Sequence, residues 1–166
     1  MMLRKLTPIK LMFLVNSQAP PASVMAANHI ANWSDVWSSD GLKRIAAFAD
    51  IVGPETQIIL PRDTDGRGLP PSAFVANAHA AGLLVHVWSV NPENQDLPLD
   101  LRCGDPAAPT FPHQLGDVAT QARRLFALGV DGAFSDAPEV LVKVRSEGAS
   151  AWATSPGSPG SCPSVR

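Results

Sequence analysis

The most constraining feature of this sequence is the stretch from Leu83 to Asn94, LLVHVWSVNPEN, which starts apolar and β-branched and turns polar at Asn91. Such a run is typical of a strand buried in a parallel sheet and followed by a loop. The preceding residues, Ser72–Ala81, carry apolar side chains at helical spacing, with Ser72 as a candidate N-cap and Gly82 as the glycine after the helix. The sequence therefore predicts a helix that leads into a buried strand.

The same order of elements recurs near the C-terminus. Val118–Phe126 has an apolar stripe with a period of about 3.6 residues, and Gly129 closes this second helix. Val130–Ser135 follows as a short strand, and Pro138 is suited to the first turn of a further helix. Helices that alternate with strands in this way indicate parallel βα units.

The first half of the chain adds two more strands. Ile9–Asn16 reads as a buried strand, and a secretory signal fits less well because Lys10 interrupts the apolar run. A helix and a very short strand, Ala49–Pro54, come after the long connection Ser17–Asp40. The apolar run Gln57–Leu60 fits either another strand or the buried edge of a loop.

Length and composition then fix the class of protein. A chain of 166 residues with 45% hydrophobic and 17% charged residues is a soluble globular domain, here α/β with about four parallel βα units. We expect one domain over residues 1–145 and a disordered Ser/Gly/Pro-rich tail over 146–166. Complete eightfold βα barrels typically need about 250 residues, so this chain has room for half of one.

Several classes of function are disfavoured. A net charge of −2 without a Lys/Arg cluster argues against a nucleic-acid partner, and no apolar run reaches the ~18 residues of a membrane span. Cys103 and Cys162 lack metal-ligand spacing, which favours unpaired thiols over a zinc site or a disulfide. Trp33 and Trp37, in the first long connection, favour a loop that packs over the core rather than a ligand platform.

Polar side chains at two strand ends are the candidates for chemistry. His86 lies two residues before Trp88, so both point to one face of the sheet, where His86 is either a hydrogen-bonded core residue or a site residue. Asn91 lies just past the end of that strand, with Glu93 and Asn94. Barrel enzymes reach their substrates from such positions.

Asp136 stands at the end of the last predicted strand. Its carboxylate is placed to cap the helix that begins at Pro138, to contact a substrate, or to do both. Glu93 and Asp136 would be the carboxylate pair of an unrelated barrel such as a glycosidase, although nothing in the sequence fixes their separation.

Taken in order, these segments resemble the second half of the glycerophosphodiester phosphodiesterase family, nearest to its bacterial exported branch. The likeness runs from about Leu3 to Arg145, and its order and spacing carry more weight than any one motif. The segments that carry it are Leu6–Leu11 with Leu14, Gly41-Leu42, Ala49–Pro54, Ala78–Leu83, Val85–Val90, Glu93-Asn94, Leu97-Pro98 and Leu128–Pro138.

The resemblance implies the C-terminal half of a TIM-type barrel that hydrolyses glycerophosphodiesters to glycerol 3-phosphate and an alcohol in lipid metabolism. Family members hold calcium or magnesium with carboxylates and use a histidine pair as acid and base, which is sound chemistry for a phosphodiester. Those residues belong to the family's first half, and its His-Arg-Gly signature has no counterpart here. No catalytic or metal-binding residue of this chain is therefore predicted, and we expect the chain alone to be inactive.

What the resemblance carries over is the lining of the substrate mouth: His86, Trp88, Ser89, Asn91 and Asp136. The exported branch often has an arginine where Asn91 stands, which weakens the expected hold on phosphate. The alternative is a non-catalytic half barrel that binds a ligand, or associates with a second copy or with the missing N-terminal half. The sequence as it stands suggests a cytoplasmic protein. If the chain derives from an exported protein, we expect it to be periplasmic or secreted.

Overall fold

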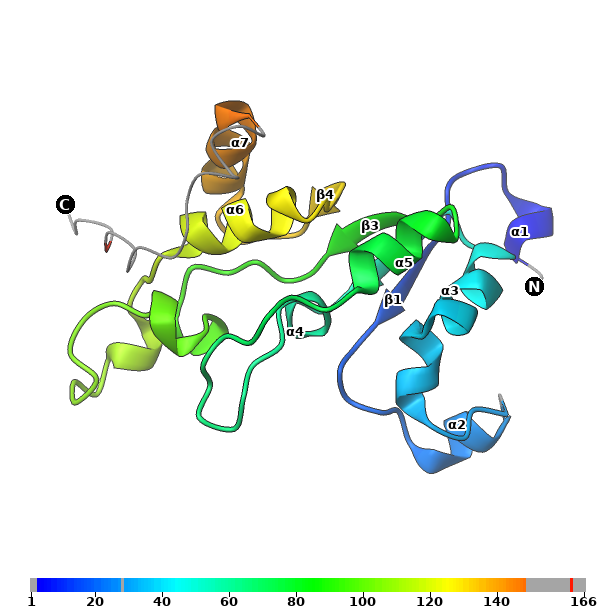
Figure 1. The fold of residues 1–166 in the computed structure, drawn as a ribbon, viewed down its shortest axis with the longest axis horizontal. Coiled ribbons are helices and arrows are strands. Elements are labelled where there is room, and N and C mark those ends of the chain that lie inside the picture. The colour runs from blue at the N-terminus through cyan, green and yellow to red at the C-terminus, as the bar shows by residue number, and fades with distance from the viewer. Residues whose placement is uncertain (1–2, 28, 149–161, 163–166) are drawn as a thin grey trace.

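The computed structural model describes residues 3–27, 29–148 and Cys162. Helices and strands alternate along the chain, as Figure 1 shows. The elements in order are α1 (Leu3–Leu6), β1 (Met12–Val15), α2 (Ala22–Ala27), a 3₁₀ helix (Trp33–Trp37), α3 (Ser39–Ala46), β2 (Ile51–Pro54), α4 (Thr56–Ile59), α5 (Phe74–Ala80), β3 (Leu84–Val87), three 3₁₀ turns (Asn94–Asp96, Leu99–Leu101 and Phe111–His113), α6 (Val118–Ala127), β4 (Gly132–Ala133) and α7 (Pro138–Glu147).

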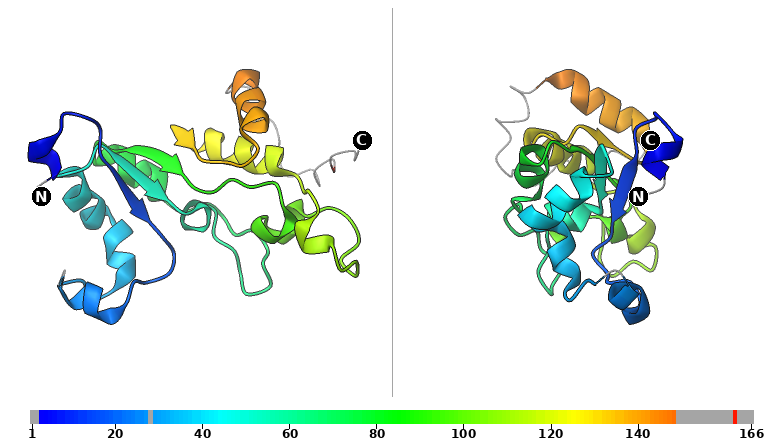
Figure 2. Two further views of the ribbon diagram at one scale, coloured as in Figure 1. Left: turned by 180° about the vertical axis from the view of Figure 1, so that it is seen from behind. Right: turned by 90° about the vertical axis from the view of Figure 1, so that its right-hand side faces the viewer.

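The four strands form one parallel sheet in the order β1-β2-β3-β4, which confirms the predicted α/β class. Each strand pairs with the next one along the chain: Phe13 is in register with Val52, and Val52 with Val85. Because parallel crossovers are almost always right-handed, a sheet in sequential order places its connecting helices on one face. Figure 1 views the sheet from the side that α5 covers, and the reverse view in Figure 2 shows the strands uncovered.

Burial differs between the two faces of the sheet. Val52, Val85 and Val87 have no exposed surface and pack against the apolar sides of α3, α5 and α6. Side chains of the opposite face are open: Leu14 is 59% exposed and Phe134 is 51% exposed. The core therefore lies between the sheet and one layer of helices.

The ends of the helices follow from local sequence. Ser38 accepts a hydrogen bond of 3.1 Å from the backbone N–H of Gly41 at the start of α3. Asp117 caps α6 by accepting from the backbone N–H of Thr120 at 2.9 Å. Gly82 and Gly129 follow α5 and α6 with φ of +82° and +92°, a conformation that glycine adopts without strain.

Two local predictions are wrong. Gln57–Leu60 was expected to be a strand or the buried edge of a loop, but its residues form most of the one-turn helix α4. The pairing with β3 ends at the bond from the N–H of Thr56 to the carbonyl of Trp88, and the N–H of Leu60 then bonds the carbonyl of Thr56 to close the helical turn. Asp136 does not cap α7, whose N-cap position is Ala137 without a side-chain hydrogen bond; the hydroxyl of Ser135 accepts from the N–H of Ala137 instead.

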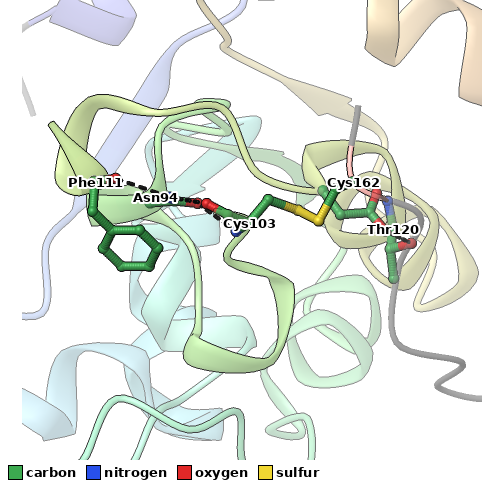
Figure 3. Close-up of a disulfide and its surroundings, with 6 residues drawn as sticks. Asn94, Cys103, Phe111, Thr120 and Cys162 are labelled. Carbon is green, nitrogen blue, oxygen red and sulfur yellow. Dashed lines mark hydrogen bonds between the residues drawn. A yellow bond between two sulfur atoms is a disulfide. The ribbon is translucent and has the colours of Figure 1, made fainter. Parts of the chain in front are cut away.

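The cysteine prediction is also wrong. Cys103 and Cys162 form a disulfide, with their Cα atoms 5.6 Å apart although 59 residues separate them in sequence. Figure 3 shows the bond beside Asn94, whose carboxamide bonds the backbone N–H and carbonyl of Cys103 at 2.9 and 2.7 Å. The disulfide attaches the C-terminal end of the chain to the loop after β3.

The predicted tail lies mostly outside the described residues. Helix α7 continues through Ser146 and Glu147, and beyond Gly148 only Cys162 is described. Trp33 and Trp37 pack against the core, as predicted, with their rings edge to face at 6.0 Å. Within the described ranges, no helix is long and apolar enough to cross a membrane.

Candidate functional site

A pocket of about 220 Å³ opens at the carboxyl ends of β2 and β3. The two strands end side by side, and Glu55 and Trp88, the residues that follow them, are paired across the gap. Parallel strands thus deliver polar side chains to one edge of the sheet, where open α/β proteins bind ligands. The pocket is lined by Glu55, Thr56, Gln57, Arg62, Trp88, Ser89, Asn91, Gln95 and Asp96.

Trp88 and Ser89 form the wall on the β3 side. The indole Nε1 of Trp88 donates a hydrogen bond of 2.7 Å to the carbonyl of Gly53, which fixes the ring over β2. The hydroxyl of Thr56 donates to the carbonyl of Ser89 at 3.0 Å and holds the next turn of chain in place. The Trp88–Ser89 peptide bond is cis. The wall is therefore fixed from both strands.

Glu55 contributes a carboxylate on the β2 side. Its Oε2 accepts hydrogen bonds from the backbone N–H of Ser17, at 2.8 Å, and from the Ser17 hydroxyl. Because Ser17 begins the loop after β1, these bonds join the ends of the first two strands. The carboxylate is thus held in place beside the pocket by neutral donors.

Arg62 contributes the opposite charge. The guanidinium donates to the backbone carbonyl of Asp96, and it forms no ion pair with any carboxylate among the described residues. Burial lowers the pKa of Arg62, and the positive charge of Arg102 lowers it further. The carboxylates of Asp96, Asp100 and Glu55 oppose this shift without forming an ion pair with the guanidinium, whose remaining N–H groups can donate to an anion.

Asn91 carries an unsatisfied polar atom at the same pocket. Its Oδ1 is buried and has no hydrogen-bond partner among the described residues. Leaving such an acceptor unpaired costs about 1–3 kcal/mol, so an orphan of this kind calls for a specific explanation. A ligand hydroxyl or amine placed here would supply the missing donor.

The structure brings together three of the five residues predicted from sequence: Trp88, Ser89 and Asn91. His86 lies instead over β4 on the open face, where a Cβ atom added to Gly132 would come within 2.9 Å of the imidazole. Asp136 lines a different pocket of about 410 Å³, between the starts of α6 and α7.

Sequence reasoning missed Glu55, Thr56 and Arg62. The first two could have been found, because they directly follow the buried strand Ala49–Pro54 in the same way that Asn91 follows its own. Arg62 does not follow a predicted strand, so the sequence pattern does not indicate that it lies at the pocket. It reaches the pocket from the α4–α5 loop, where its backbone forms an antiparallel bridge with Gly68.

The described residues do not fit a divalent cation. No three His, Cys, Asp or Glu side chains among them gather closely enough to hold a metal ion. None of the four histidines lines the pocket, and His79 bonds Asp131 at 2.9 Å near the opposite end of β3. The pocket itself offers a guanidinium, two carboxylates and neutral hydrogen-bonding groups.

Comparison with known proteins agrees with the arrangement of the sheet. A family model described as the glycerophosphoryl diester phosphodiesterase family matches residues 1–140, most of the chain. A search of curated proteins found no match.

Proposed function

Since the chain belongs to the glycerophosphoryl diester phosphodiesterase family, we propose that the pocket after β2 and β3 binds the glycerophosphate part of a glycerophosphodiester. The observation that carries this proposal is the meeting of an unpaired arginine, a fixed indole and an orphaned amide oxygen in one pocket. Members of the family cleave such diesters to glycerol 3-phosphate and an alcohol.

Each of the three groups has a distinct task. The guanidinium of Arg62, which forms no ion pair within the described part of the chain, binds the phosphodiester anion. The Oδ1 of Asn91 accepts from a glycerol hydroxyl, which removes its desolvation cost. The Trp88 ring supplies an apolar wall for the carbon chain of glycerol.

We propose further that these four βα units are the C-terminal half of the family's barrel. The sequential parallel order, the single layer of helices and the exposed Leu14 and Phe134 support this view, because a complete barrel buries that face in its interior. Another half, or a second copy, would then cover the face. The catalytic histidines and the metal ligands come from the other half, and the chain alone does not turn over substrate.

The disulfide supports descent from an exported protein. Disulfides persist in oxidising compartments and are rare in the cytosol. The Cys103–Cys162 bond accounts for both cysteines of the chain. We therefore place the protein in the periplasm or outside the cell, in line with the exported branch that its sequence resembles.

Calorimetric titration with glycerol 3-phosphate tests the binding proposal without requiring catalysis. We expect the wild-type chain to bind and Asn91→Ala to bind about tenfold more weakly, the value of one hydrogen bond to a desolvated group. Asn77→Ala, on the remote helix α5, is the matched control and should bind as the wild type does. Equal affinity of Asn91→Ala and the wild type would contradict the proposal.

A further inference from the structure

A second and larger pocket, of about 480 Å³, adjoins the first. It lies between the α4–α5 loop, the loop after β3 and helix α6, and it shares Arg62 with the glycerophosphate pocket. Arg62 is the one residue that lines both. An anionic group bound by Arg62 therefore lies beside both pockets.

Of the two arginines that line this second pocket, Arg62 is the one available to bind an anion. Arg124 also lines the pocket, but its Nη2 donates to the Asp100 carboxylate at 2.9 Å and the two charges offset each other. Leu60 and Pro98 are among the side chains that make the walls mainly apolar. The pocket thus offers one anchor for an anion and a largely apolar space beyond it.

Gln121 adds a polar group to this apolar space. The residue is 1% exposed and lines the pocket from α6, and its Oε1 has no hydrogen-bond partner in the part of the chain that the structure describes. Asn91 and Gln121 therefore present two orphaned amide oxygens, one in each of the two pockets that Arg62 joins. A donor on the ligand would satisfy each of them.

We infer that the second pocket holds the alcohol part of the diester and selects alcohols that carry their own hydrogen-bond donor. This inference rests on the proposed function, which places the phosphate at Arg62. A primary ammonium group, as in glycerophosphoethanolamine, donates to the carboxamide of Gln121. The quaternary ammonium of glycerophosphocholine has no N–H and leaves that oxygen unpaired.

The discriminating variant is Gln121→Met, which keeps the length of the side chain and removes the amide. Because the amide oxygen is unpaired in the free protein, the methionine variant should fold with unchanged or higher thermal stability. Gln18→Met, on an exposed residue outside both pockets, is the matched control.

Calorimetric titration with glycerophosphoethanolamine, glycerophosphocholine and glycerol 3-phosphate tests the inference. We expect the wild type to bind the ethanolamine diester about tenfold more tightly than the choline diester, the value of a hydrogen bond from a charged donor. Gln121→Met should abolish this preference, whereas Gln18→Met should keep it. In NMR spectra, the side-chain amide of Gln121 should shift with the ethanolamine diester and not with glycerol 3-phosphate.

Two negative results have different meanings. If glycerol 3-phosphate binds but the two diesters bind equally, or if Gln121→Met keeps the preference, the inference about the alcohol pocket is overturned and the proposed function stands. If none of the three ligands binds, the proposed function fails and the inference fails with it.

Discussion

At the scale of single residues, Trp88 links the sheet to the pocket. Its indole N–H bonds the carbonyl of Gly53 at 2.7 Å, so Trp88→Phe keeps an aromatic ring but removes this hydrogen bond. We expect the free energy of unfolding to fall by about 1 kcal/mol in urea titrations. Affinity for glycerol 3-phosphate should also fall, because the ring is no longer fixed at the pocket.

Trp37→Phe provides the control, since Trp37 is a half-buried tryptophan outside the pocket. It should change stability without changing affinity for the ligand. Wild-type affinity in Trp88→Phe would show that the indole takes no part in binding.

The sequence predicted some of these residues and not others for a clear reason. Trp88, Ser89 and Asn91 lie at the end of a strand, and the alternation of a strand fixes which way its side chains point. His86 follows the same alternation, but its neighbour in the sheet is Gly132, so the ring lies over β4. Arg62 depends on the path of a loop, which local pattern does not determine.

At the scale of elements, Gly41 governs how α3 packs against the 3₁₀ helix before it. A Cβ atom at this position would lie 2.2 Å from the backbone oxygen of Asp35 and 2.3 Å from that of Val36. Backbone cannot move aside as a side chain can, so Gly41→Ala should lower the free energy of unfolding by about 3 kcal/mol. Gly68→Ala, whose nearest contact is a side-chain atom at 3.3 Å, should cost much less. Similar denaturation midpoints for the two variants would contradict this packing.

We expect the contact between α6 and α7 to depend on pH. Arg123 binds Glu147 through two hydrogen bonds of 2.8 and 2.9 Å, and these bonds lower the pKa of Glu147. A depressed carboxyl pKa adds stability above the ordinary glutamate pKa of about 4.3, and the contribution is lost as pH falls through the lower folded-state value. Thermal melts from pH 6 downward should therefore show a loss of stability below about pH 4.3.

Glu147→Gln removes the titrating group and should flatten that part of the pH profile. Glu139→Gln, on the same helix, should leave it unchanged. A wild-type profile in Glu147→Gln would show that other carboxylates cause the acid sensitivity.

Helices and strands were predicted best where the apolar pattern extended over many residues. The helices of Ser72–Ala81 and Val118–Phe126 and the strand after Leu83 were all found, with ends shifted by a few residues. The apolar run of α4 is only four residues long, too short for a helical period to differ from a strand. Where its pairing with β3 stops depends on Trp88, a residue distant in sequence.

At the scale of the whole molecule, the disulfide joins segments that sequence alone does not relate. The expectation of unpaired cysteines failed because Cys103 and Cys162 lie 59 positions apart, a separation that local spacing does not relate. Replacing both by serine should lower the free energy of unfolding by about 2–4 kcal/mol. Reduction of the wild type should produce a similar loss, whereas the serine variant should not respond to reductant. Equal melting temperatures for the oxidised wild type and the serine variant would contradict the stabilising role.

The uncovered face of the sheet bears on how the protein works. Leu14 and Phe134 are both more than half exposed on the side that the helices leave open. β1 and β4 are the terminal strands of the four-stranded sheet, and unpaired strand edges favour association. Both features are expected of a barrel segment that functions with another half.

The most direct test is release of glycerol 3-phosphate from glycerophosphocholine, with calcium or magnesium added. The purified chain should release none alone, and release should begin when the family's first four βα units are supplied as a separate chain. That activity should fall in Asn91→Ala and persist in Asn77→Ala. Turnover by the chain alone that disappears in His86→Ala would show that this chain carries its own catalytic histidine, and the half-barrel proposal would be wrong.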